Sequence, residues 1–241
     1  HYTIVRGQIP IHSVDVGYML TAKTGYIKVS HFGEQTHREY VEAFSALKEK
    51  GMQFLVLDLR GNPGGYLKTA IDLADEFLPV NKLIVYTEGR SRPRESFYAT
   101  SSGLFEQGKL VVLVDEGSAS ASEIVSGALQ DWDRATIMGR RSFGKGLVQE
   151  QSEFSDGSAI RLTVARYFTP TGRCIQKPYG QEGSDYETEL YERIKRGELV
   201  TSDSIHFSDS LRYKTPGGKI VYGGGGIMPD VFIPIDTNGT S

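Results

Sequence analysis

A serine and a lysine in two glycine-containing segments have the side chains needed to hydrolyse an acyl bond. Ser120 lies in segment 117–123, between an apolar run and an amphipathic pattern, so we expect it at a helix N-terminus. A serine hydroxyl is a weak nucleophile until a base takes its proton, and a lysine kept neutral by apolar surroundings can be that base. Lys145 lies between two glycines, with Phe143 and Leu147 close enough to exclude water. We therefore predict Ser120 as nucleophile and Lys145 as general base.

Three further groups could support such a pair. Gln149 follows Lys145 by four positions, and residues four apart on a strand share a face, so its side chain could orient the lysine. The N–H of Ala121 and one N–H from the glycine-rich turn 61–65 could donate to a developing oxyanion. The positive end of the helix dipole would add to that stabilisation.

Each of these residues also has an ordinary structural interpretation. Ser120 and Glu123 have the spacing of a helix capping box, and Ser118 or Ser122 could be the cap instead. Most lysines are solvated surface groups, and turn 61–65 could be only a turn. The residues taken one by one therefore leave both the catalytic and the structural interpretation open.

The elements that must position these groups alternate between strands and helices. Apolar runs predict strands at 26–29, 54–57, 83–86, 110–114, 136–138, 147–150 and 160–168. Helical spacing predicts helices at 36–50, 67–78 and from 121 to about 132, whereas the polar segment 88–107 is interpreted as an irregular surface excursion. This alternation predicts a layered α/β domain with some parallel strands.

Composition excludes several other classes of function. The chain has 241 residues, 39% of them hydrophobic, and a net charge of −3, which gives no reason to expect nucleic acid or an anionic membrane as partner. No apolar run approaches the length that spans a bilayer. Cys174 is the single cysteine, so no intrachain disulfide can form. No cluster of His, Cys or carboxylates has ligand spacing, so we predict neither a metal nor another cofactor.

Two rival motifs fit the sequence poorly. Segment 139–145 nearly matches a phosphate-binding loop, but Gly146 replaces its hydroxyl residue and a strand is expected where the motif needs a helix. A Ser-His-Asp hydrolase would need one of five histidines, yet no G-x-S-x-G elbow occurs and His31 and His37 are interpreted as surface groups.

Five segments in order nevertheless resemble one family. Segments 58–65, 117–124, 143–149, 156–167 and 226–230 are similar to motifs of the carboxyl-terminal processing peptidases, also called tail-specific proteases. The resemblance runs from about residue 25 to about residue 231. It implies a ClpP/crotonase-like α/β core, and it assigns Ser120 as nucleophile, Lys145 as base, Gln149 as its positioning residue, and Gly65 and Ala121 as oxyanion donors. Asp131, eleven positions after Ser120, matches a supporting acidic position in some members.

The resemblance also carries expectations about the whole protein. It implies an endopeptidase that cleaves proteins near their C-termini in the bacterial periplasm or cell envelope, with protein or peptide substrates. An envelope adaptor or a second copy of the chain are the other partners it suggests. The alternative is a non-catalytic relative that binds peptides or apolar ligands on the same fold, which the loss of Ser120 or Lys145 would have favoured.

The resemblance and the composition together predict four parts of the chain. Residues 1–24 would lead out of a missing N-terminal PDZ domain, and 25–178 would form the catalytic core. Residues 179–215 are rich in Glu, Asp, Ser, Tyr and Lys and are interpreted as a charged insertion, with one helix at about 188–196. Residues 216–241 would return a C-terminal strand segment to the core.

Overall fold

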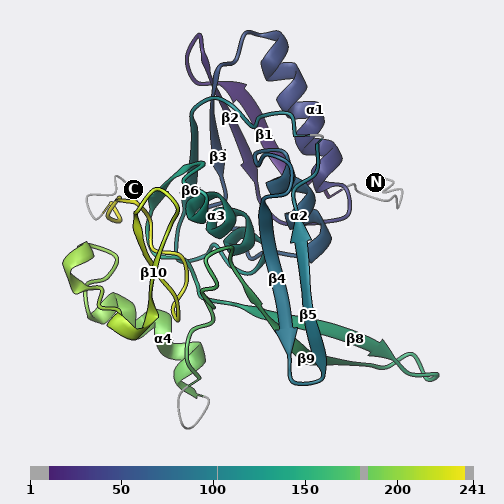
Figure 1. Ribbon diagram of the computed structural model, residues 1–241, viewed down its shortest axis with the longest axis vertical. Helices are drawn as coiled ribbons and strands as arrows, with labels where there is room; N and C mark the ends of the chain where they lie inside the picture. The colour runs from purple at the N-terminus through teal and green to yellow at the C-terminus, as the bar shows by residue number, and fades with distance from the viewer. Residues whose placement is uncertain (1–10, 102, 180–183, 237–241) are drawn as a thin grey trace, which may run out of the picture.

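The computed structural model describes residues 11–101, 103–179 and 184–236, and its centre is a six-stranded sheet in the order β1-β2-β3-β6-β7-β12 (Figure 1). Its strands are β1 (Val14–Met19), β2 (Thr24–Val29), β3 (Phe54–Asp58), β6 (Leu110–Val114), β7 (Thr136–Gly139) and β12 (Val231–Phe232). From β2 to β12 neighbouring strands are parallel, and β1 runs antiparallel at the edge. The expected α/β class with parallel strands is confirmed.

Three helices supply the core beside this sheet. They are α1 (Thr36–Glu49), α2 (Leu67–Asp75) and α3 (Ala121–Asp131), close to the predicted ranges. Every residue of α3 is buried, because α3 contacts α2, β7 and the second sheet through β4. A helix enclosed on all sides is held rigidly, so its first residue is a precise platform for a reactive side chain.

The second sheet has four antiparallel strands in the order β5-β4-β9-β8. They are β4 (Leu83–Gly89), β5 (Arg92–Tyr98), β8 (Leu147–Glu153) and β9 (Ala159–Phe168). The hairpin of β8 and β9 extends away from the body of the molecule (Figure 1). Segment 88–107 was expected to be irregular, and this is wrong for β5, whose side chains are mostly exposed while its backbone pairs with β4. Because the residues of β5 are mostly polar, the sequence pattern did not predict the strand, which forms through backbone pairing with β4.

The ends of the chain also join the core. Residues 1–10 lie outside the described part, and β1, within the segment 1–24, pairs with β2 at the edge of the sheet. Near the C-terminus, β12 pairs with β7 at the opposite edge. The division of the chain into four parts stays a prediction. A further small sheet, β10 (Arg212–Lys214) with β11 (Ile220–Tyr222), has no counterpart among the predicted strands.

The charged segment forms α4 (Ser184–Lys195), η1 (Ser202–Ser204) and η2 (Asp209–Leu211). Its predicted helix exists and begins four residues earlier than expected, at Ser184. Among the described residues, no helix is both long and apolar enough to cross a membrane.

Candidate active site

The predicted site residues, with one exception, line a single cavity of about 700 Å³. It lies between turn 63–67, the N-terminus of α3 and the start of β8. The structure brings together at its wall Ser120, Lys145, Gln149, Gly65 and Ala121. The exception is Asp131. In their predicted roles, these residues are a nucleophile, its base and positioning residue, and two backbone donors, which are the parts that acyl transfer requires.

Ser120 has a backbone conformation that few non-glycine residues adopt. It precedes α3 as the N-cap residue, with φ 54° and ψ −111°. Such strain persists only where the surroundings fix the backbone, and it is concentrated at functional sites. The turn presents the partly buried Ser120 side chain to the cavity.

One buried carboxylate fixes the backbone of both Ser120 and Lys145. Glu123 is fully buried, and its Oε2 accepts hydrogen bonds from the N–H groups of Ser120 and Lys145, each at 2.8 Å. Its Oε1 accepts from the Ser142 hydroxyl at 2.5 Å and from the Gly144 N–H at 2.7 Å. Burial raises the pKa of Glu123, and these four donors oppose that effect. Glu123 thus sets where the two segments of the site meet.

A tyrosine hydroxyl contacts the same two residues from their carbonyl side. Tyr167 on β9 is buried, and its hydroxyl lies 3.0 Å from the Ser120 carbonyl oxygen and also within hydrogen-bond distance of the Lys145 carbonyl oxygen. The peptide groups of both residues are therefore held at their N–H ends by Glu123 and at their C=O ends by Tyr167.

The glycine-rich turn is pressed against Ser120. Gly64 has φ 97°, and a Cβ there would lie 2.7 Å from both the Ser120 Cβ and the Ala119 carbonyl oxygen. Its N–H already donates to Asn62 Oδ1 at 2.8 Å. Gly65 follows with φ 153°, and a Cβ there would collide with the Phe32 carbonyl oxygen. Only glycine fits at both positions, so the turn can lie directly against Ser120 at Gly64 and against Phe32 at Gly65.

Lys145 and Gln149 share the cavity wall without contacting each other through any described hydrogen bond. Lys145 precedes β8 and is partly buried, whereas Gln149 is an exposed residue on β8. In the described part of the chain, Lys145 Nζ also makes no direct hydrogen bond with Ser120 Oγ. In the absence of substrate, catalytic hydrogen bonds are often long and tighten only in the complex.

Asp131 lies at the other end of α3, about 16 Å from Ser120 at the rise of an α-helix. Its Oδ1 is 2.7 Å from Arg173 Nη2, and its Oδ2 accepts from the Thr171 N–H and hydroxyl. Any support that Asp131 gives to the site is therefore transmitted through α3 rather than by contact.

The rival motifs find no support in the geometry. Gly146 leads directly into strand β8, not into the helix that a phosphate-binding loop requires. No histidine of the described residues lines the cavity, and those residues contain no cluster of three or more His, Cys, Asp or Glu suited to a metal.

Sequence reasoning missed Glu123 and Tyr167 as site residues. Glu123 was noted only as half of a capping box, and its carboxylate does accept the Ser120 N–H as that motif requires. Its other three donors come from residues 142–145, which no local pattern could reveal. Tyr167 had no signal beyond its place in segment 156–167.

Comparison with known proteins identifies a family for the chain. A model of the peptidase family S41 matches residues 23–184. A carboxyl-terminal-processing protease from Synechocystis sp. is 48% identical over 198 residues, which cover 82% of this chain and 45% of that protein. The carboxy-terminal processing protease CtpA of Bacillus subtilis is 37% identical over 175 residues, or 73% of this chain and 37% of that protein.

Solved structures show the same fold. A photosystem II D1 C-terminal processing protease superposes with a TM-score of 0.66 at 28% identity, covering 98% of this chain and 52% of its own. A putative S41 protease from Bacteroides fragilis has a TM-score of 0.62 at 17% identity, covering 79% and 59%. The chain spans less than half the length of the two curated relatives above. With the family model matched over most of its length, the chain belongs to peptidase family S41.

Proposed function

We propose that this chain is the catalytic part of a serine endopeptidase in which Ser120 is the nucleophile and Lys145 the general base. The observation that carries the proposal is the shared cavity, where both side chains lie beside two backbone amides while Glu123 binds both of their N–H groups. Family membership adds that a peptidase of this kind acts on proteins or peptides.

The mechanism follows from these positions. Neutral Lys145 takes the proton of Ser120 as the hydroxyl attacks the substrate carbonyl. The N–H groups of Gly65 and Ala121 would stabilise the oxyanion, and no described hydrogen bond occupies either group. Lys145 then protonates the leaving amine. Water finally hydrolyses the acyl-enzyme, which releases the acyl product and restores the Ser120 hydroxyl. Gln149 would orient the lysine head group as substrate enters.

The substrate class is proposed from the relatives. Curated relatives named carboxyl-terminal-processing proteases support cleavage near the C-terminus of a protein. We extend this to envelope proteins as substrates, with action in the bacterial periplasm or cell envelope. An adaptor or a second copy of the chain that delivers substrate belongs to the same proposal.

The decisive experiment compares hydrolysis of an unfolded protein such as casein by the full-length protein and its variants. Ser120→Ala and Lys145→Ala should each lower kcat by at least about 1,000-fold, the effect of removing a member of a catalytic unit. Ser152→Ala and Lys23→Ala replace exposed residues of the same types outside the cavity and should leave kcat unchanged.

Two outcomes would overturn the proposal. If Ser120→Ala cleaves as fast as the wild type, the nucleophile lies elsewhere. If the wild type binds peptides tightly and hydrolyses none of them, the protein is instead a non-catalytic binder on the same fold.

A further inference from the structure

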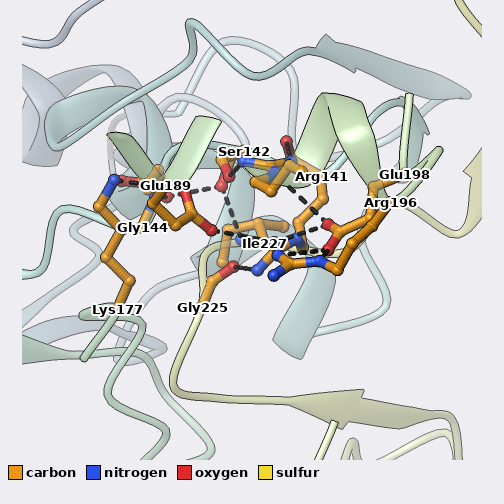
Figure 2. A network of polar contacts seen from close by, with 11 residues as sticks. Arg141, Ser142, Gly144, Lys177, Glu189, Arg196, Glu198, Gly225 and Ile227 are labelled. Carbon is orange, nitrogen blue, oxygen red and sulfur yellow. Dashed lines mark hydrogen bonds and ion pairs between the residues drawn. The ribbon is translucent and has the colours of Figure 1, made fainter. Parts of the chain in front are cut away.

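The charged segment after β9 is packed against the loop that precedes Lys145 (Figure 2). A helix with charges of both signs normally faces water. Here, however, the side chains of Arg193 and Glu198 are only 1% and 5% exposed. Burying charges is expensive, and buried ion pairs often contribute little to stability. Their presence beside the site calls for a role other than stability alone.

Arg193 of α4 binds the loop through both of its terminal nitrogens. Nη2 donates to the Arg141 carbonyl at 2.7 Å, and Nη1 donates to the Ser142 carbonyl at 3.1 Å. Its Nε lies 3.3 Å from Glu198 Oε2, which orients the guanidinium. A planar guanidinium presents its donors in a rigid fork that can hold two successive carbonyls at once, whereas a lysine ammonium carries its donors on a single nitrogen without that fixed geometry.

The same segment is tied to the loop a second time. Arg141 Nη2 lies 2.7 Å from Glu198 Oε2 and 3.2 Å from Glu189 Oε1, and its Nη1 donates to the Gly225 carbonyl at 2.8 Å. Figure 2 shows Arg141 directed at Glu198, and Gly225 and Ile227 on the C-terminal segment beside it. Residues 141 and 142 are thus enclosed by α4 and by the C-terminal segment.

Ser142 connects this network to the catalytic residues. Its hydroxyl accepts from the Ile227 N–H at 2.6 Å and donates to Glu123 Oε1 at 2.5 Å. Glu123 in turn accepts the N–H groups of Ser120 and Lys145. A continuous set of hydrogen bonds therefore runs from Arg193 through Ser142 and Glu123 to both residues.

We propose that Arg193 is a positioning residue for the peptidase reaction. By holding the carbonyls of residues 141 and 142, it fixes the Ser142 hydroxyl, so that Glu123 keeps the Ser120 and Lys145 segments at their working separation. The charged segment then helps to position the site residues and is not only a solvated surface insertion. The inference rests on the proposed function, because Lys145 is the proposed base, and Arg193 itself touches neither substrate nor the reacting side chains.

Arg193→Gln tests this role in the full-length protein, with Arg196→Gln as matched control. Arg196 also pairs with Glu198, at 2.9 Å, but its side chain is 55% exposed and no described hydrogen bond joins it to residues 141–145. A misplacement of about 1 Å can lower rates about 100-fold, so we expect kcat of Arg193→Gln to fall about 10- to 100-fold with KM within about twofold. Arg193→Lys, which keeps the charge but loses the planar fork of donors, should recover part of the rate.

Hydrogen exchange of peptides covering residues 142–147 reads the position of the loop without catalysis. Arg193→Gln should exchange there about tenfold faster, because the Gly144 and Lys145 amides lose their fixed acceptor, while strand β3 exchanges as in the wild type. Unchanged exchange in this loop would overturn the inference. If Arg193→Gln loosens the whole core, Arg193→Lys is compared with the wild type instead. A lowered kcat together with faster loop exchange in an intact core supports the inference. A lowered kcat with wild-type loop exchange overturns it. A wild type that hydrolyses nothing refutes the proposed function, while the exchange result still decides the role of Arg193 in positioning.

Discussion

The two ends of α3 each bury a carboxylate completely, but they use it differently. Glu123 at the N-terminal end meets three backbone N–H groups and one hydroxyl. Asp131 at the C-terminal end meets the guanidinium of Arg173 and both donors of Thr171. A carboxylate bound by backbone amides fixes the course of the main chain, whereas one bound by a cation joins two elements through their side chains.

The difference indicates that the N-terminal end of α3 is the one that fixes the position of the main chain. Displacing Glu123 would move the peptide groups of Ser120 and Lys145 directly. Displacing Asp131 would leave a buried cation without its partner, while the backbone at the far end of α3 keeps its other contacts. We therefore expect loss of activity at one end and loss of stability at the other.

Asp131→Asn should have the largest effect, and it should be on stability. Arg173 is fully buried, so removing its counter-charge should lower the free energy of unfolding by about 3–5 kcal/mol. Denaturant unfolding measures this change. Asp72→Asn, which removes the partner of exposed Lys68, is the matched control and should change stability by less than about 0.5 kcal/mol. Equal effects of the two substitutions would contradict the assignment of Asp131 to a buried ion pair.

Glu123→Gln tests the N-terminal end of α3, where we expect the loss to be in activity. An amide nitrogen would face N–H donors, so the Ser120 and Lys145 segments should separate and kcat should fall by about 100-fold, or about 2.7 kcal/mol. Steady-state kinetics on a peptide substrate measure the loss, and circular dichroism checks the fold. A variant that unfolds readily but retains wild-type kcat while folded would show that Glu123 only stabilises α3.

A third carboxylate sharpens the comparison because it combines both kinds of partner. Glu76 Oε2 accepts the Leu104 N–H at 2.7 Å, and its Oε1 lies 2.7 Å from His37 Nε2. The hydrogen bond to Glu76 raises the pKa of His37 above 6.5, although burial opposes it. The stability from this pair is therefore full below the ordinary histidine pKa and is lost as the pH rises through the higher folded value.

His37→Gln should accordingly have the smallest and most pH-dependent effect. We expect a loss of at most about 1 kcal/mol near pH 5.5, since His37 is partly exposed, and a smaller loss near pH 8.5. Thermal unfolding at the two pH values gives the difference. An equal loss at both would mean that the charge of His37 contributes nothing.

The sequence predicted the residues that line the cavity better than the framework that holds them. Ser120, Lys145 and the glycine turn lie in short local motifs, and the resemblance of these motifs to one family, rather than the residues taken singly, predicted that they share a site. Glu123 and Tyr167 contact backbone groups of distant segments. Every residue type has a backbone carbonyl and nearly every type a backbone N–H, so the residue types give no sign of such contacts. Arg193 was missed for a related reason, since a helix rich in both charges looks solvated unless its partners are known. Strand β5 was missed because its polar side chains face water while its backbone pairs with β4.

The positive φ of Ser120 carries one more consequence. Glycine would adopt φ 54° without steric penalty, so Ser120→Gly should give an inactive protein that is more stable by about 1 kcal/mol. Under the proposed function, the protein therefore gives up some stability for a serine hydroxyl at this position. Attempts to make the protein more heat-resistant should leave residue 120 and the turn beneath it untouched.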